Sequence, residues 1–170
     1  MARNNVYLYI VEGECEQHAL SYLKNKYIES GRILVLNPLQ KEITNIRIRS
    51  FKENTIAILI FDTDTADGVK ILEKNIKILR KAKNIKDIII IPQVENFEDE
   101  LVRASNIRKI EEFTNSKTKK DFKRDFLANK NLPNLFQKNK FDIKKFWMGV
   151  PTGLYKNLKN EAIKIKKDTY

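Results

Sequence analysis

The chain has 170 residues, a mass of 20.0 kDa and a hydrophobic content of 42%, which suits one folded domain with a substantial core. Its one cysteine, Cys15, excludes an internal disulfide, and no apolar run approaches the roughly 20 residues that span a bilayer. The first residues do not resemble a secretory leader, so we expect a cytoplasmic protein without a membrane partner.

The formal net charge of +11 is unevenly distributed along the chain. Residues 1–100 contain 15 Lys and Arg against 15 Asp and Glu, whereas residues 101–170 contain 18 against 7, so the whole excess lies in the second part. Lys, Ile and Asn are abundant throughout, as in proteins from AT-rich genomes, but such a bias would raise Lys in both parts. The asymmetry therefore favours an anionic partner such as nucleic acid.

The first predicted elements are a strand, a glycine turn and a helix. Residues 6–11 form a short run of β-branched and aromatic residues, which is typical of a buried strand, and Glu12-Gly13 ends this strand. Apolar residues then recur at helical spacing to about Ser30, with Glu14 and Glu16 in the first turn, where the helix dipole favours negative charge.

Three further strands follow. Residues 33–36 form a short one, residues 55–61 the strongest one in the chain, and residues 87–92 the last. A helix is predicted from the turn after the strongest strand to about Lys83, whereas residues 41–54 fit a strand or a helix equally well. Strands that alternate with helices predict an α/β fold with a mostly parallel, four-stranded sheet.

The domain prediction is an α/β core over residues 1–105 and a basic α-helical extension over residues 106–170 that packs on this core. The extension is expected to end in a helix, because four apolar residues repeat there at helical spacing: Leu154, Leu158, Ala162 and Ile165. Ligands of parallel α/β sheets bind beyond the carboxyl ends of the strands, so that edge is where we expect the site.

Acidic residues directly follow two of the predicted strands. Asp62 and Asp64 are two apart, so in an extended backbone their side chains leave on the same face, and a cation between them would relieve their repulsion. Mg²⁺ accepts one or two carboxylates plus phosphate oxygens. Glu12 precedes a glycine that permits close approach to a ligand, so it is a candidate metal ligand or general base. The alternative is that these acids cap helices or complement a helix dipole.

A third acidic cluster occupies residues 95–100. Helical spacing places Glu98 on the same stripe as Phe97 and Leu101, where an unpaired carboxylate would be costly, so it is predicted to belong to the site. A salt bridge to Arg103 is an equally good interpretation. The other acids of the cluster, Glu100 among them, are expected to be solvated.

The densest basic run covers residues 116–124 and includes one aromatic residue, Phe122. Such a run is often a solvated helix face, but it also suits contacts with a phosphate backbone, and Lys117 or Lys120 is a candidate for stabilising a scissile phosphate. The candidate nucleic-acid-binding residues are Lys117, Lys119, Lys120, Lys123 and Arg124. His18 has no second histidine to share a metal, and the acids beside Cys15 make it a poor nucleophile.

The order of these motifs resembles a known family. The sequence Val11-Glu12-Gly13-Glu14-Cys15-Glu16 after a first strand, and Phe61-Asp62-Thr63-Asp64 after a later one, are similar to the Toprim domain of topoisomerases, bacterial primases, OLD-type nucleases and small ribonucleases. The third cluster and the position of Glu16 resemble in particular the OLD and RloB-like branch, found among bacterial defence and mobile-element proteins. The resemblance covers residues 5 to about 105.

This resemblance implies a Toprim-like, Rossmann-like fold and a divalent-metal-dependent nuclease acting on DNA or RNA. Glu12, Asp62 and Asp64 would hold one or two Mg²⁺ or Mn²⁺ ions, and Glu16 and Glu98 would be further catalytic acids. A separate ATPase or regulatory subunit is a candidate partner, because OLD nucleases carry an ATPase domain that this sequence does not match. The alternative is a non-catalytic Toprim-like module that binds nucleic acid or a partner.

Overall fold

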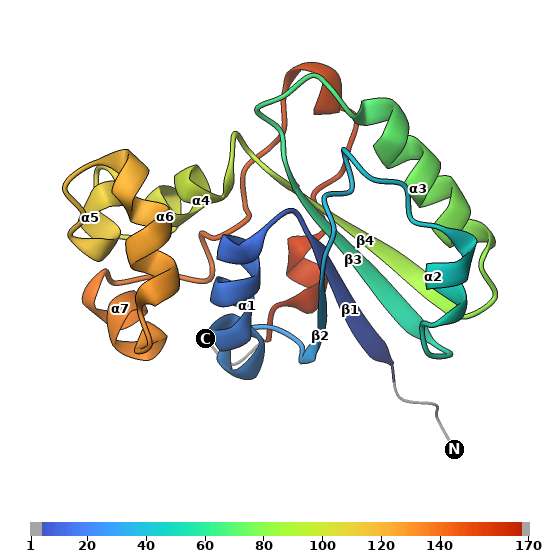
Figure 1. Ribbon diagram of the computed structural model, residues 1–170, viewed down its shortest axis with the longest axis horizontal. Helices are drawn as coiled ribbons and strands as arrows, with labels where there is room; N and C mark the ends of the chain where they lie inside the picture. The colour runs from blue at the N-terminus through green and yellow to red at the C-terminus, as the bar shows by residue number, and fades with distance from the viewer. Residues whose placement is uncertain (1–4, 168–170) are drawn as a thin grey trace.

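The computed structural model describes residues 5–167; residues 1–4 and 168–170, at the outer ends of the two predicted parts, lie outside the described residues. Its centre is a sheet of four parallel strands in the order β2-β1-β3-β4 (Figure 1). The strands are β1 Val6–Val11, β2 Gly31–Val35, β3 Thr55–Asp62 and β4 Ile85–Gln93. Helices flank the sheet, so the predicted α/β class with a parallel sheet is confirmed, and the architecture is Rossmann-like.

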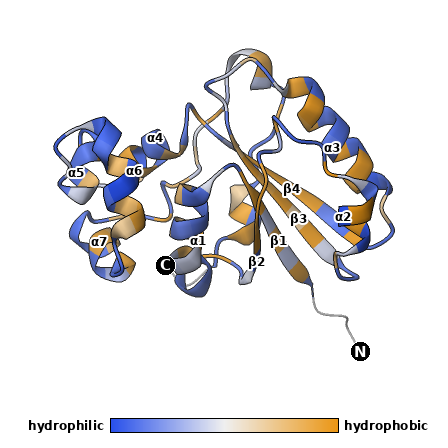
Figure 2. Cartoon of the chain, viewed as in Figure 1, coloured by the Kyte–Doolittle hydropathy of each residue, from blue (hydrophilic) through white to orange (hydrophobic). Residues whose placement is uncertain are grey.

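Strand β3 is central because it is apolar on both faces. Its first seven residues are buried, and successive side chains join different cores. Ile58 and Ile60 belong to one apolar cluster, whereas Leu59 and Phe61 belong to the other. The strands are accordingly the most continuously hydrophobic part of the chain (Figure 2).

Helical segments cover both faces of the sheet. In chain order they are α1 Glu14–Lys26, α2 Asn45–Arg49, α3 Val69–Lys81, α4 Phe97–Ala104, α5 Ile110–Thr114, α6 Lys119–Ala128 and α7 Leu132–Lys138, followed by the 3₁₀ helices η1 Gly153–Tyr155 and η2 Ala162–Ile165. Helices α1 and α4–α7 share one apolar cluster with one face of the sheet, and α2 and α3 share a second cluster with the other face (Figure 1).

Two local predictions are refined by the structure. Helix α1 ends at Lys26, four residues before the predicted end, because Ile28 instead pairs with Lys166 in an antiparallel bridge. The segment that fitted a strand or a helix contains the short helix α2, whose start is capped by Thr44, with its hydroxyl accepting from the Arg47 N–H at 3.3 Å.

The predicted final helix is wrong. The segment that contains Leu154 and Ile165 forms only the two short 3₁₀ turns, and Leu154 is 64% exposed. The backbone is held instead by the sheet: the Glu161 carboxylate accepts from the Ile90 N–H at 3.1 Å, and the Glu161 N–H donates to the Ile90 carbonyl. These bonds cover part of the free edge of β4 and replace the bonds of a helix.

The segment after residue 105 packs on the core largely through aromatic rings. Phe126 of α6 contacts His18 of α1 edge-on, and Phe136 of α7 contacts Tyr22 of α1. The resulting apolar cluster is continuous from the sheet to α7. Within residues 5–167, no helix is both long enough and apolar enough to cross a membrane.

Candidate functional site

Acidic side chains from three separate segments meet at the carboxyl edge of the sheet. Glu12 directly follows β1, and Asp62 is the last residue of the neighbouring strand β3. Because parallel strands end at the same edge, both residues border one hollow of about 210 Å³. The residues that line it are Glu12, Gly13, Glu14, Cys15, Glu16, Asn37, Asp62, Phe97, Glu98 and Lys123.

Two helix starts supply the remaining acids. Helix α1 begins after Gly13, and its first turn carries Glu16, which is only 6% exposed. Helix α4 begins after Asn96, whose side chain accepts from the Asp99 N–H at 3.0 Å, and its first turn presents Glu98 to the hollow. Both turns lie at positive ends of helix dipoles, which makes acidic side chains there less costly.

Burial and mutual repulsion raise the pKa of these carboxyls. Burial, then the charges of Glu12 and Glu16, raises the pKa of Asp62 to about 9. Burial also raises the pKa of Glu12 to about 7, although the Asp62 backbone and the Asn37 side chain partly offset the effect. The pKa of Glu16 is raised as well, chiefly by burial. Asp62 therefore holds a proton at neutral pH, and Glu12 is about half protonated there, unless a cation replaces these protons.

Two carboxylate oxygens of the site have no hydrogen-bond partner among the described residues, although they are buried: Glu12 Oε1 and Asp62 Oδ1. Buried polar atoms are normally satisfied, so this pair is suited to a ligand that accepts oxygen donors, and a hard divalent cation is such a ligand. No three or more His, Cys, Asp or Glu side chains in residues 5–167 are already arranged to hold a metal together. The fit to Mg²⁺ or Mn²⁺ therefore rests on the Glu12–Asp62 pair.

Asp64 is placed differently from its predicted partner Asp62. It is exposed and does not line the hollow, because β3 ends at Asp62 and the chain turns there. Its charge nevertheless contributes to the raised pKa of Glu12 and of Asp62, so it lies near the site. The prediction that Asp62 and Asp64 leave one face of an extended strand therefore fails for Asp64, which lies beyond the end of β3.

Of the five predicted nucleic-acid-binding residues, only Lys123 lines the hollow. It is exposed on α6, and its charge lowers the pKa of both Cys15 and Glu16. Arg124 is held by Asp121 and Asp125 at 3.0 and 2.9 Å on the surface of the same helix. The other three lysines, Lys117, Lys119 and Lys120, are exposed and border no part of the hollow.

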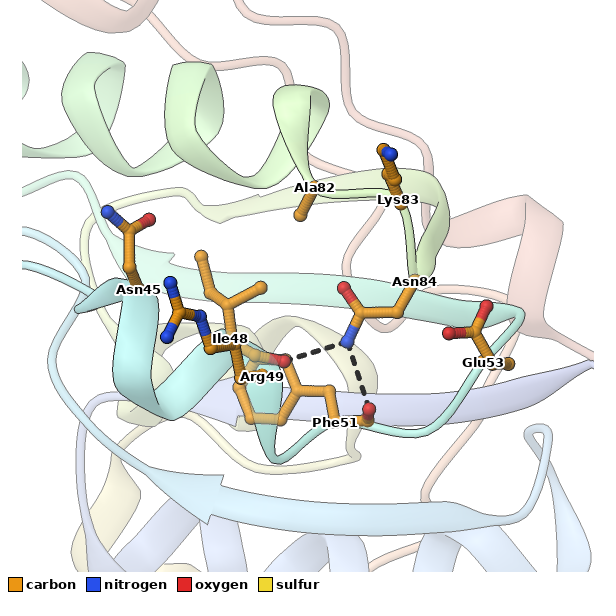
Figure 3. A pocket seen from close by; sticks show the side chains of 8 residues that line it. All are labelled: Asn45, Ile48, Arg49, Phe51, Glu53, Ala82, Lys83 and Asn84. Carbon is orange, nitrogen blue, oxygen red and sulfur yellow. Dashed lines mark hydrogen bonds between the residues drawn. The ribbon is translucent and has the colours of Figure 1, made fainter.

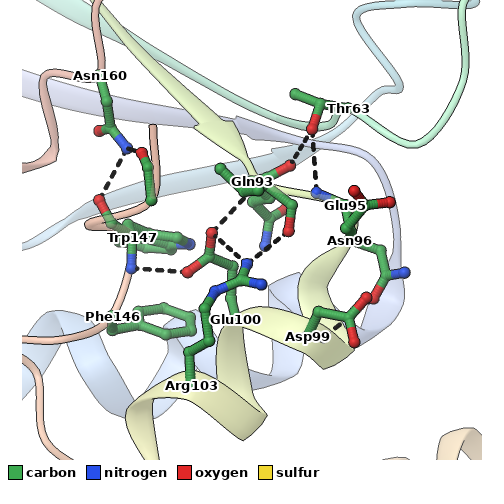
Figure 4. Close-up of polar contacts among 12 residues, drawn as sticks. Thr63, Gln93, Glu95, Asn96, Asp99, Glu100, Arg103, Phe146, Trp147 and Asn160 are labelled. Carbon is green, nitrogen blue, oxygen red and sulfur yellow. Dashed lines mark hydrogen bonds and ion pairs between the residues drawn. The ribbon is translucent and has the colours of Figure 1, made fainter. Parts of the chain in front are cut away.

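The third acidic cluster corrects the sequence analysis. Glu98 is only partly buried, whereas Glu100, which we expected to be solvated, is 0% exposed. Arg103 pairs with Glu100 at 2.9 Å, and the two carboxylate oxygens of Glu100 accept from the Val94 and Trp147 backbone N–H groups at 2.9 and 3.1 Å (Figure 4). The salt-bridge interpretation therefore applies to Glu100, and Glu98 is free to face the site.

Sequence reasoning missed two polar residues at this edge. Asn37 follows β2 and lines the hollow, a position that the strand-end rule would have indicated. Gln93 is the last residue of β4, is 0% exposed and pairs in register with Asp62. Neither side chain is charged, so the acidic pattern in the sequence did not indicate them.

Two further residues with reactive side chains, Cys15 and His18, were not assigned to the site. Burial, assisted by the charge of Glu16, raises the pKa of the Cys15 thiol to about 12, which makes it a poor nucleophile. His18 lies on α1, where its Nε2 is 3.0 Å from the Asn129 carbonyl oxygen and its ring packs on Phe126. Both side chains have structural surroundings.

A larger hollow, of about 420 Å³, lies at the opposite end of the sheet (Figure 3). It is bordered by residues that precede β3 and β4, among them Glu53 and Asn84. The Asn84 amide nitrogen donates to the carbonyls of Ile48 and Phe51, at 2.7 and 2.9 Å. The Asn84 amide nitrogen is thus occupied by the fold, and within residues 5–167 no cluster of buried carboxylates borders this hollow, so the smaller acidic hollow is the better candidate for chemistry.

The fold and site together define an α/β protein with a parallel sheet and an acidic hollow at its carboxyl edge. Comparison with known proteins adds no closer assignment: no family model, no curated protein and no solved structure matches this chain.

Proposed function

We propose that this chain is a divalent-metal-dependent nuclease that hydrolyses phosphodiester bonds of DNA or RNA in the cytoplasm. The observation that carries the proposal is the pair of buried, unpartnered oxygens of Glu12 and Asp62 at adjacent strand ends. Their raised pKa values mark a site that favours positive charge, and perturbed carboxyls in a hollow are typical of functional sites. The likeness of the first two motifs to the Toprim family supports the same function.

Glu12 and Asp62 would be the principal ligands of Mg²⁺ or Mn²⁺, with Asp64 nearby as a further ligand. Mg²⁺ is usually held by one or two carboxylates, waters and substrate phosphates, so a pair of protein ligands is sufficient. A bound cation would polarise a phosphoryl oxygen and favour deprotonation of an attacking water.

The protein's own residues would bind and orient the substrate. Glu16 and Glu98 line the hollow, and burial raises the pKa of Glu16 above its ordinary value, which suits a group that exchanges a proton with the substrate or an attacking water. Lys123 would neutralise a phosphate oxygen at the rim. The exposed Lys117, Lys119 and Lys120 would contact the nucleic-acid backbone farther along, with Arg124 on the same helix surface.

The test is cleavage of labelled plasmid, single-stranded DNA and structured RNA with Mg²⁺, Mn²⁺ or EDTA. Wild-type protein should cut at least one substrate with a cation and none with EDTA, and Asp62→Asn should abolish cutting. The matched control is Asp67→Asn, an exposed acid in the same loop that does not line the hollow. Loss of cutting in both variants would indicate a loop defect and would count against a metal role for Asp62.

Two lysine variants separate the hollow from the general basic surface. Lys123→Ala should lower the cleavage rate at saturating substrate, whereas Lys117→Ala should only weaken substrate binding and reduce its dependence on salt. If the protein binds nucleic acid but does not cleave it in the presence of any of the cations, the alternative is favoured: a module that binds nucleic acid or a partner such as an ATPase.

A further inference from the structure

The Gln93 side chain is a buried amide without a partner. It is 0% exposed, and within the described part of the chain neither Nε2 nor Oε1 has a hydrogen bond. The Gln93 backbone carbonyl, in contrast, accepts from both the N–H and the hydroxyl of Thr63, at 3.1 and 2.9 Å. Buried amides are normally satisfied, so an unpaired one requires an explanation, and a bond that forms when a ligand occupies the site would supply it.

Gln93 is next to the candidate cation ligand Asp62. The two residues are register partners in the β3–β4 pair, where neighbouring strands are about 4.8 Å apart. Side chains alternate along a strand, so Gln93 shares its face with Ile91 and Asp62 shares the same face with Ile60. Asp62 Oδ1 is also buried and unpartnered, so an orphan acceptor and an orphan donor lie on neighbouring strands.

A second orphan donor approaches the same strand end. The Glu100 carboxylate binds Val94, which follows Gln93, with one oxygen and Trp147 with the other, so Trp147 is held beside the end of β4 (Figure 4). The Trp147 indole Nε1 is buried and has no acceptor among the described residues. An indole donor and an amide oxygen are complementary, and a bond between them leaves the amide nitrogen for Asp62.

We propose that Gln93 is a positioning residue: in the cation-bound site its Nε2 donates a hydrogen bond to the Asp62 carboxylate, while its Oε1 faces the indole N–H of Trp147. The inference rests on the proposed function, since it requires a cation at Asp62. The bond fixes the orientation of the carboxylate, so that one oxygen is directed at the cation and the other at the amide. Without it, the same cation binds to a carboxylate that is free to rotate.

The test is the affinity of the protein for Mn²⁺ alone, measured by titration calorimetry without nucleic acid. Gln93→Met keeps the length of the side chain and removes both polar atoms, and it should weaken Mn²⁺ binding about tenfold, the effect of one hydrogen bond to a charged group. The melting temperature in EDTA should stay the same or rise, because the variant no longer buries an unpaired amide. A purely structural role predicts the opposite: a lower melting temperature and unchanged affinity.

Asn75→Leu is the matched control. Asn75 is also 0% exposed, but its amide is fully used, accepting from the Ile43 N–H at 2.7 Å and donating to the carbonyls of Pro38 and Lys41. The control should lower the melting temperature and leave the Mn²⁺ affinity of the folded protein unchanged.

Trp147→Phe keeps the ring without the N–H and gives a second test should Gln93→Met not fold; it should also weaken Mn²⁺ binding. If folded Gln93→Met binds Mn²⁺ as tightly as wild-type protein, the role of Gln93 is overturned and the proposed function stays intact. If Gln93→Met does not fold, the same conclusion follows when Trp147→Phe binds Mn²⁺ as tightly as wild-type protein. Absence of Mn²⁺ binding by wild-type protein overturns both.

Discussion

Replacing Asp62 by asparagine should stabilise the metal-free protein, and the gain should grow with pH. The pKa of Asp62 is raised from 3.8 to about 9, first by burial and then by the charge of Glu12. Between these values the folded protein retains a proton that the unfolded chain has released, so stability is highest below pH 3.8 and falls as pH rises toward 9. At about 1.4 kcal/mol per pH unit, the cost of retaining this proton reaches about 4 kcal/mol at pH 7.

Asparagine carries no such cost, so Asp62→Asn should match wild-type stability near pH 4 and exceed it by up to about 4 kcal/mol at pH 7. The assay is urea unfolding from pH 4 to pH 8 in EDTA, with the exposed Asp67→Asn as the control. A difference that does not change with pH, or a variant that is less stable at pH 7, would refute the account of Asp62 as a buried, proton-holding carboxyl.

Three further predictions concern other buried groups. Glu100→Ala should destabilise the fold by about 3–5 kcal/mol in urea unfolding, because it removes the acceptor of two backbone N–H groups and the partner of Arg103. The control, Asp99→Ala, should change stability by less than about 0.5 kcal/mol. Similar losses in the two variants would contradict the assignment of Glu100 as the buried, paired acid. With a pKa of about 12, only about one Cys15 thiol in ten thousand is ionised at pH 8, so iodoacetamide should label native protein far more slowly than urea-unfolded protein, as followed by mass spectrometry. Equal labelling rates would show that the thiol is accessible. Tyr155→Phe should cost about 1 kcal/mol in urea unfolding by removing the 2.8 Å bond from the Tyr155 hydroxyl to the Thr65 carbonyl, and unchanged stability would show that water replaces this bond.

The fold was predictable where hydrophobic pattern and local turns agree. Residues 56–61 are apolar without interruption and rich in β-branched side chains, a pattern typical of a short strand covered on both faces. The parallel arrangement then places Glu12 and Asp62 at one edge, so the centre of the candidate site follows from strand order alone.

The remaining errors have tertiary causes. Helical spacing placed Glu98 on the apolar stripe, yet Glu100 is the buried acid. Its partner Trp147 is 47 residues away in the sequence, so the local pattern could not indicate this contact. The final segment has helical spacing too, but its backbone bonds to the edge of β4 through Glu161. Lys123 could not be distinguished from its basic neighbours because the packing of α6 on α1 decides which lysine reaches the hollow.

The late segment that contains Tyr155 and Glu161 has a consequence for the order of assembly during synthesis. The site acids and Lys123 are all translated by residue 123, whereas the bond from Tyr155 to Thr65 in the loop after Asp62 and the bond from Glu161 to the edge of β4 need residues that are translated later. Chains grow from the amino terminus at about 5–20 residues per second, so a nascent chain carries every candidate site residue before these two restraints exist. These two restraints, on the loop after Asp62 and on the edge of β4, therefore form only after the site residues have been made.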